Sequence, residues 1–317
     1  MTIDQSREKD STSPATHAPS PDPIAALRRP SGGLAMLAID QREALRSMMS
    51  DAADDGHVSD DRLREFKVDA ARILTPYASA ILIDHQFGWD AVLSADVVAP
   101  TCALISSADE FLSSATELVS ESRIDTSVDL RRAAQQGAVA AKLLVLYRAD
   151  EPSSDRIRLV DAFVERCRDA GLAAIIEPVV RDSRDGRPAD LGTQVVAAAH
   201  ELGNLGADLY KAQVPFAGNA DDDVLIGECR AVTEAVASPW VVLSSGVAPT
   251  SFPRAVRLAV RAGASGFLAG RAIWAPSLSA ASPSDDMAVH ATARLQALGE
   301  CVDEELHARS RPASHQR

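Results

Sequence analysis

Short apolar runs alternate with helix-like segments along most of this chain, and this alternation limits the folds open to it. Each run is rich in Ala, Val, Ile or Leu, which is typical of strands buried on both faces, as in a parallel sheet covered by helices. Eight runs are expected to form strands: residues 34–39, 79–84, 102–106, 141–147, 173–178, 208–214, 240–245 and 266–268.

Amphipathic segments between the runs predict helices. The clearest, residues 155–170, precedes Gly171, a residue type that commonly ends helices. The other expected helices are 42–51, 60–74, 191–205, 221–237, 253–262 and 287–307, and residues 108–137 are expected to hold helix and loop. Eight strands alternating with helices favour a (β/α)₈ TIM barrel over the alternative, a doubly wound open sheet.

The expected organisation is a single barrel domain over residues 28–309, flanked by two tails. The N-terminal tail, residues 1–27, is rich in Ser, Thr, Pro and charged residues, and a composition of this kind favours disorder. The C-terminal tail, residues 310–317, is expected to be loose. A chain of 317 residues is long enough for one such barrel.

Composition narrows the range of partners. The formal net charge is -13, which argues against nucleic acid as a partner, although local basic groups can still bind a small anion. No apolar run is long enough to span a membrane, and no signal-peptide core is expected at the N-terminus. The four cysteines are scattered and are expected to be buried thiols. These features predict a cytoplasmic protein without membrane contact.

Two lysines stand within predicted strands, where charged side chains are rare. In a barrel enzyme the reacting groups lie at the carboxyl ends of the strands. Burial at Lys211 would favour the free amine, the form that attacks a ketone to give an imine. Lys142 could lower the pKa of Lys211 or stay charged and hold an oxyanion. The alternative is structural, with both lysines in ion pairs with Glu177 and Asp40.

Other strand ends suggest proton transfer and phosphate binding. Glu177 closes an apolar strand, a setting that raises a carboxyl pKa and suits a proton shuttle, unless it forms a structural bridge to Arg181 or Lys142. The loops after the last two strands of a barrel often hold phosphate. The residues expected there are Ser244, Ser245, Gly246, Gly270 and Arg271.

The histidines do not form a pattern typical of a metal site. Of the seven, only His85 falls at a predicted strand end. We therefore expect no bound metal and no cofactor, and the lysine route to carbon–carbon bond cleavage is favoured.

Several of these motifs resemble those of one enzyme family. The segments are residues 31–44, 76–84, 142–148, 175–181, 206–211, 243–247 and 262–272. They resemble the class I sulfofructosephosphate aldolases of sulfoglycolysis, the route of sulfoquinovose degradation, within a broader group that includes tagatose-1,6-bisphosphate aldolases. The resemblance extends over about residues 28–308 and leaves out the N-terminal tail.

The resemblance implies a role for each matching residue. Lys211 would be the Schiff-base lysine and Glu177 the proton-shuttling carboxylate, while Asp40, Gln41 and Lys142 would line the reacting end of the substrate. The five residues after the last two strands would bind the phosphate. One departure is Gln213, which stands where relatives carry Glu.

The implied reaction cleaves 6-deoxy-6-sulfofructose 1-phosphate to dihydroxyacetone phosphate and sulfolactaldehyde. Two alternatives remain open: a tagatose- or fructose-1,6-bisphosphate aldolase, and a non-catalytic sugar-phosphate sensor. The bisphosphate aldolase differs only in binding a phosphate, rather than a sulfonate, at the far end of the substrate. The candidates for binding that end are His85, Gln86, Arg148 and Arg181. The expected partner is a small phosphosugar or sulfosugar, and association into a homo-oligomer is left open.

Overall fold

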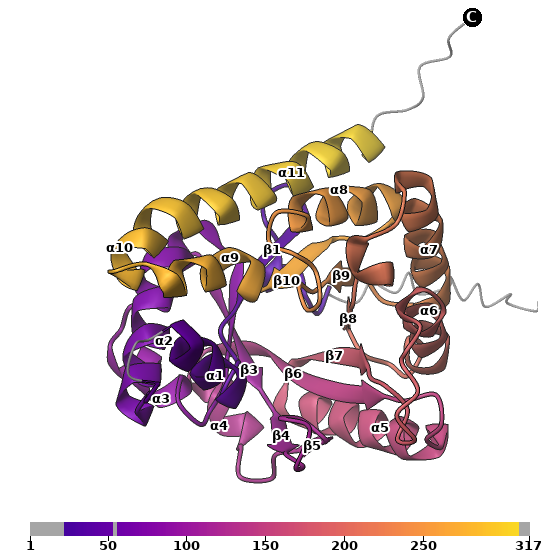
Figure 1. Ribbon diagram of the computed structural model, residues 1–317, viewed down its shortest axis with the longest axis horizontal. Coiled ribbons are helices and arrows are strands. Elements are labelled where there is room, and N and C mark those ends of the chain that lie inside the picture. Colours follow the sequence, from indigo (N-terminus) through magenta and orange to yellow (C-terminus); the bar gives the residue numbers. More distant parts are fainter. Residues whose placement is uncertain (1–21, 53–55, 311–317) are drawn as a thin grey trace, which may run out of the picture.

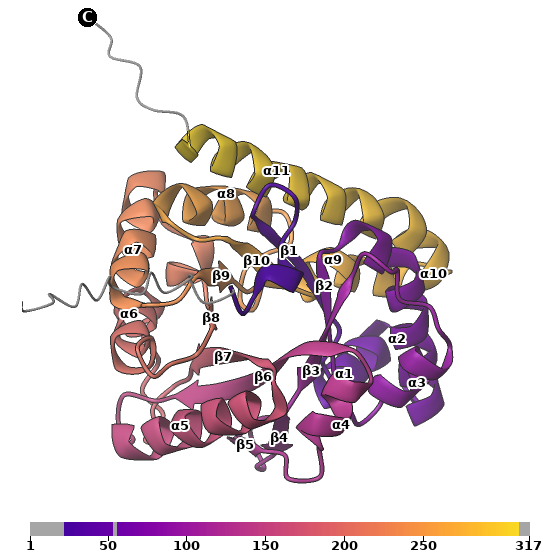
Figure 2. The ribbon, with the colours of Figure 1, turned by 180° about the vertical axis from the view of Figure 1, so that it is seen from behind.

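The computed structural model describes residues 22–52 and 56–310, and its central feature is a closed barrel of eight parallel strands (Figures 1 and 2). β1 pairs with both β2 and β10, which closes the ring. In order around the barrel the strands are β1 (Leu34–Ala38), β2 (Ala80–Ile83), β3 (Ala103–Ser107), β6 (Ala138–Tyr147), β7 (Ala173–Val180), β8 (Leu209–Ala212), β9 (Trp240–Val242) and β10 (Gly266–Ala269). The predicted (β/α)₈ barrel is confirmed.

Helices surround the barrel, and the predicted ones are present with ends shifted by a few residues. α5 ends at Gly171, whose φ of 70° is the left-handed conformation expected there. The predicted helix 287–307 starts with a π-helical turn, Met287–Ala291. The helices are α1 (Glu43–Ala52), α2 (Asp60–Leu74), α3 (Trp89–Ser94), α4 (Leu130–Gln135), α5 (Ser153–Ala170), α6 (Leu191–Leu202), α7 (Asp222–Ala235), α8 (Phe252–Ala262), α9 (Arg271–Trp274), α10 (Pro283–Asp286) and α11 (Thr292–Ser310).

Alternation along the strands decides which side chains enter the barrel. A packed apolar layer inside it includes Ala140, Ile175 and Leu209. Because successive side chains point to opposite faces, the residues two positions further on point inward too. Those residues are Lys142, Glu177 and Lys211, which places them directly above the apolar layer, toward the carboxyl ends of the strands.

Three features differ from the sequence predictions. The short helices α3, α9 and α10 were not predicted. Residues 108–137 contain an antiparallel hairpin, β4 (Asp109–Leu112) and β5 (Glu121–Ile124), before α4. A short 3-10 helix, Ala25–Leu27, lies within the predicted N-terminal tail. Ile24 and Leu27 are buried against the apolar layer of the barrel, so the described fold begins before residue 28. Residues 1–21 and 311–317 of the two predicted tails lie outside the described residues.

The cysteine prediction is confirmed, because all four thiols are free and buried. Burial raises the pKa of the Cys102 thiol to about 12, which keeps it protonated at neutral pH. In the described part of the chain, no helix has the length and apolar character needed to cross a membrane.

Candidate active site

Four of the predicted residues meet at the carboxyl ends of the strands. Glu177 Oε2 lies 2.9 Å from Lys211 Nζ and 3.2 Å from Lys142 Nζ, so one carboxylate oxygen connects the two ammonium groups. Asp40 Oδ2 lies 2.6 Å from Lys142 Nζ. All four side chains are at least nine-tenths buried, and charges in such a setting interact strongly. The ion pairs of the two lysines with Glu177 and Asp40, which the structural alternative expected, are therefore present, and they join the four residues in one cluster at the strand ends.

A fifth member, Asp109, was not predicted. Its Oδ2 accepts hydrogen bonds from Lys142 Nζ at 2.8 Å and from the amide of Leu144 at 3.0 Å. Its Oδ1 accepts from Arg42 Nη2 at 2.8 Å and from the Ser107 hydroxyl at 2.7 Å. Asp109 is fully buried at the start of β4, so the hairpin supplies a carboxylate to the cluster. The sequence signal was the same as at Asp40, a carboxylate just after an apolar strand.

The surroundings of Lys142 determine its charge. Burial alone would lower the pKa of Lys142, but Asp109, Asp40 and Glu177 outweigh burial and raise that pKa well above its usual value. Burial would likewise raise the pKa of Asp40, yet the charges of Lys142 and Lys211 lower it. The pKa of Asp109 is also lowered, because Lys142 and Arg42 together outweigh its burial. Of the two roles predicted for Lys142, the structure favours the permanently charged one.

Another buried lysine supports the loop that carries Asp40 and Gln41. Lys67 of α2 donates hydrogen bonds to the carbonyls of Ile39 and, at 2.7 Å, Gln41. Its Nζ also lies 2.5 Å from Asp84 Oδ1, and both side chains are fully buried. Lys67 therefore links the residues that follow β1 to the residue that follows β2. Its signal was a lysine on the apolar face of the predicted helix 60–74, beside Leu63 and Phe66.

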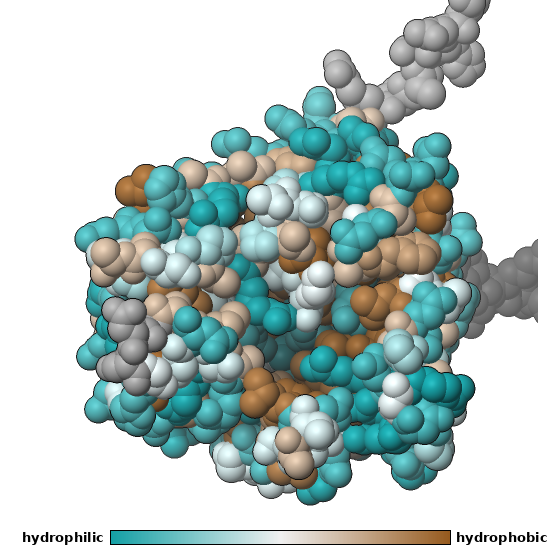
Figure 3. Space-filling model, viewed as in Figure 1, coloured by the Kyte–Doolittle hydropathy of each residue, from teal (hydrophilic) through white to brown (hydrophobic). Residues whose placement is uncertain are grey.

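A pocket of about 320 Å³ opens above the cluster. Figure 3 shows a hollow in this face of the molecule, with hydrophilic residues at its floor and both hydrophobic and hydrophilic ones around the rim. The predicted residues Asp40, Gln41, Glu177, Ser245 and Arg271 line it. The pocket is lined further by Arg42, Glu43, Ala44, Gln86, Phe111, Ser113, Leu118, Val119, Leu144, Val179 and Arg181.

Three residues of the predicted phosphate site are not part of the pocket lining. Ser244 is buried, and its hydroxyl accepts a weak 3.4 Å hydrogen bond from the amide of Ala272. Gly246 adopts φ 80°, a conformation that favours glycine and turns the chain after β9. Gly270 packs so closely on β1 that a Cβ there would lie 2.2 Å from the carbonyl oxygen of Ala38. These residues shape the loops that present Ser245 and Arg271.

The candidates for the far end of the substrate separate into two groups. Gln86 and Arg181 line the pocket. Arg148 is buried and bound by both carboxylate oxygens of Glu117, at 2.7 and 2.8 Å, so its charge is already compensated. His85 contacts the Ser106 hydroxyl at 2.8 Å and stacks on Trp89. Neither Arg148 nor His85 belongs to the pocket lining.

Gln213, which the resemblance marked as a departure, is buried beside the site. Its side-chain carbonyl accepts a 2.6 Å hydrogen bond from the amide of Val180, the last residue of β7. The residue therefore joins the ends of β7 and β8 and supports the backbone next to Arg181.

Comparison with known proteins adds to this geometry. Residues 34–276 match the model of the DeoC/LacD family aldolases. The chain belongs to this family. It is therefore an aldolase, an enzyme that makes or breaks a carbon–carbon bond.

The chain is similar to proteins named tagatose 1,6-diphosphate aldolase. It is 28% identical to one from Listeria monocytogenes over 300 residues, which cover 87% of each chain. It is 30% identical to one from Enterococcus faecalis over 271 residues, with 77% of this chain and 80% of the relative covered.

Solved structures share the fold at lower identity. A fructose-bisphosphate aldolase from Plasmodium falciparum matches with a TM-score of 0.67 and 12% identity, covering 89% of this chain and 93% of that one. The protein Cgl0159 from Corynebacterium glutamicum matches with a TM-score of 0.64 and 18% identity, covering 88% of each chain. These similarities support the barrel fold.

Proposed function

We propose that the chain is a class I aldolase in which Lys211 forms a Schiff base with a ketose 1-phosphate. One observation carries the proposal: Lys211 Nζ is buried 2.9 Å from a carboxylate oxygen of Glu177, and Glu177 lines the pocket. An amine must lose a proton before it can attack a ketone, and a carboxylate at this distance can accept that proton. Among the described residues Lys211 has one carboxylate partner and shares it with Lys142, so its amine is the one we assign to the chemistry.

The reaction then proceeds in balanced steps. The amine of Lys211 attacks the C2 carbonyl, and Glu177 transfers the protons needed to expel water and leave an iminium ion. The iminium accepts the electrons of the C3–C4 bond as a base removes the C4 hydroxyl proton, and the aldehyde departs. Protonation of the enamine at C3 and hydrolysis release dihydroxyacetone phosphate and restore the amine.

Lys142 and Asp40 are assigned to the reacting end of the substrate. Lys142 stays charged because of its three carboxylate partners, so it stabilises negative charge as the C4 oxygen loses its proton. Asp40 lines the pocket while bound to Lys142, which places a carboxylate and an ammonium group beside the same hydroxyl.

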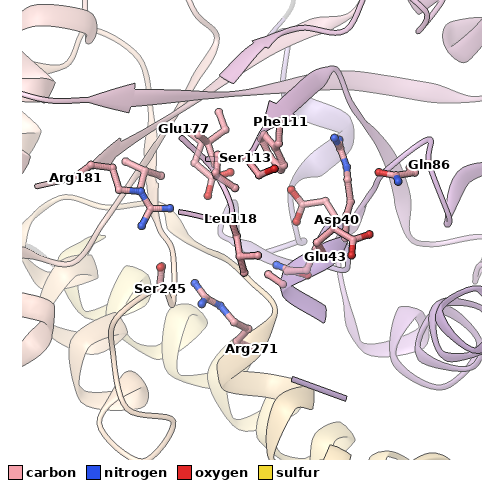
Figure 4. Close-up of a pocket in the computed structure, with 16 residues that line it drawn as sticks. Asp40, Glu43, Gln86, Phe111, Ser113, Leu118, Glu177, Arg181, Ser245 and Arg271 are labelled. Carbon is pink, nitrogen blue, oxygen red and sulfur yellow. The ribbon is translucent and has the colours of Figure 1, made fainter. Parts of the chain in front are cut away.

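The charge distribution in the pocket bears on the substrate. Figure 4 shows Gln86, Asp40 and Glu43 on the side of the pocket away from Arg181 and Ser245. Arg42 also lines the pocket, and Asp109 compensates its charge. A sulfonate carries one negative charge, whereas a phosphate monoester carries about -1.5 to -2 at neutral pH. Amide groups and a compensated cation suit the sulfonate better, so we propose 6-deoxy-6-sulfofructose 1-phosphate as the substrate.

The alternative substrate is a ketose 1,6-bisphosphate, and the names of the curated relatives favour it. Kinetics on sulfofructose 1-phosphate, tagatose 1,6-bisphosphate and fructose 1,6-bisphosphate, measured side by side with and without EDTA, decide between them. We expect the highest kcat/KM on the sulfonate and no effect of EDTA. A higher kcat/KM on either bisphosphate contradicts the substrate assignment and leaves the Lys211 chemistry standing.

A matched pair of variants tests the assignment of Lys211. Lys211→Arg keeps a positive charge but cannot form the imine, so we expect kcat to fall on the order of 10⁴-fold or more. Tyr210→Phe changes the neighbouring buried side chain, which belongs to the outer core, and should leave kcat within about twofold. Substantial activity of Lys211→Arg on the preferred ketose would overturn the proposed function.

A further inference from the structure

Two arginines lie at the same side of the pocket, and the part of the chain that the structure describes gives neither of them an ion pair with a carboxylate. Arg181 directly follows β7, and Arg271 follows β10 as the first residue of α9. Figure 4 shows their guanidinium groups on either side of Ser245, and all three residues line the pocket. Within residues 22–52 and 56–310, neither guanidinium forms an ion pair.

The surroundings of Arg181 make this arrangement costly without a ligand. Its Nε is buried and has no hydrogen-bond partner among the described residues. Burial lowers the pKa of Arg181, and the charges of Arg148 and Arg271 lower it further against the opposing effect of Glu117. Glu117 is held by Arg148, through both of its carboxylate oxygens. A buried donor without a hydrogen-bond partner destabilises the folded protein, and a bound anion would supply the missing partner.

Other arginines in the loop after β7 do have carboxylate partners. Arg184 and Arg187 follow Arg181 closely, and each is bound to a carboxylate, Arg184 to Glu151 and Arg187 to Asp185. Arg181 differs from both by facing the pocket with its charge uncompensated. Two guanidinium groups around one hydroxyl suit a tetrahedral dianion, because each can donate two parallel hydrogen bonds to phosphate oxygens.

We propose that Arg181 is a substrate-binding residue whose guanidinium and that of Arg271 bind the same phosphate group, the C1 phosphate of the ketose. The inference rests on the proposed function, and it assigns to the phosphate a residue that lies outside the loops after β9 and β10. Ser245 contributes a hydroxyl between the two arginines.

The test uses two three-carbon ketones that differ only in the phosphate. Dihydroxyacetone phosphate and dihydroxyacetone are each titrated in the presence of borohydride, and covalent modification is followed by intact mass. Arg181→Gln should raise the half-saturating concentration of dihydroxyacetone phosphate about 10- to 100-fold and change that of dihydroxyacetone less than about twofold. Arg187→Gln, which removes a charge from the same loop, should resemble the wild type with both ketones.

Two results would overturn the inference. One is an unchanged titration of dihydroxyacetone phosphate by Arg181→Gln, including the case in which only the KM for the full ketose rises, because Arg181 would then bind the other end. The other is an equal effect on both ketones, because Arg181 would then act on the site as a whole.

A separate measurement distinguishes failure of the inference from failure of the proposed function. If the wild type forms no adduct with either ketone, the Schiff-base proposal fails. Calorimetric titration with inorganic phosphate does not require the imine and still tests Arg181. Weaker phosphate binding by Arg181→Gln than by Arg187→Gln would support the inference, and equal binding would overturn it.

Discussion

The two sides of the pocket treat positive charge in opposite ways. On the side formed by β1, β4 and β6, every cation is compensated by the protein: Lys142 contacts Asp40, Asp109 and Glu177, and Arg42 contacts Asp109. On the side formed by the ends of β7 and β10, Arg181 and Arg271 have no such partners in the described chain. The positive charges on the first side are therefore compensated without a ligand, whereas we infer that an anionic ligand compensates those on the second.

This difference separates two tasks. Groups that transfer protons or stabilise developing charge must be held in place before the substrate arrives, and internal ion pairs achieve this. Groups that bind the substrate are left uncompensated, because a cation already paired with a carboxylate attracts an anion less strongly. The comparison therefore predicts that removing a charge on the first side affects stability and kcat, whereas removing one on the second affects mainly KM.

The largest effect is expected on the compensated side. Asp109→Asn leaves Lys142 with two carboxylates and Arg42 with none, so we expect the free energy of unfolding to fall by about 3 kcal/mol and kcat to fall by roughly 100-fold. Chemical denaturation and steady-state kinetics measure the two effects. Glu110→Gln, an exposed neighbour on β4, is the control. An Asp109→Asn enzyme that is as stable and as active as this control would break the comparison.

A smaller effect, of a different kind, is expected on the uncompensated side. Arg271→Gln removes a donor to the phosphate, so KM should rise about 10- to 100-fold with kcat changed only a few-fold. The free energy of unfolding should stay the same or increase slightly, because a like-charge neighbour of Arg181 is removed. A marked loss of stability in this variant would show that Arg271 is structural.

The smallest expected effect is a change in the acid limb of the stability curve. The pKa values of Asp40 and Asp109 are lowered from 3.8 in the folded protein, so their contribution is present above about pH 4 and is lost as pH falls toward the folded pKa. Unfolding free energy should therefore drop below pH 4 in the wild type. Asp109→Asn should show a shallower drop, because one of these two carboxylates no longer titrates. If the free energy of unfolding falls equally below pH 4 in the wild type and in Asp109→Asn, the assigned ion pairs are contradicted.

Strand alternation made much of the compensated side predictable. Once the runs 141–147, 173–178 and 208–214 are taken as strands, Lys142, Glu177 and Lys211 are all expected near the carboxyl halves of strands, where an inward-facing side chain reaches the site. Asp109 also follows an apolar strand, but it escaped prediction because the segment 108–137 has no clear periodicity and its hairpin was not expected. The apolar face of the predicted helix 60–74 suggested that Lys67 is buried, but the sequence does not show which strand ends this helix packs against.

The uncompensated side was harder to predict, because loops form it. Ser245 and Arg271 followed from the general position of phosphate sites in barrels, but Arg148 and Arg181 looked equivalent in sequence. Only the structure distinguishes them, through the contact of Arg148 with Glu117 and the exposure of Arg181 to the pocket. Long-range ion pairing is a tertiary property and leaves no local signal.

The central claim is that Lys211, and not Lys142, is the nucleophile. The sequence has four lysines, Lys9, Lys67, Lys142 and Lys211, so peptide mapping after borohydride reduction with dihydroxyacetone phosphate gives an unambiguous answer. We predict one adduct per chain, located on the peptide that contains Lys211, with Lys142 and Lys67 unmodified. An adduct on Lys142, or an unmodified Lys211 in an enzyme that turns over its substrate, would contradict the claim.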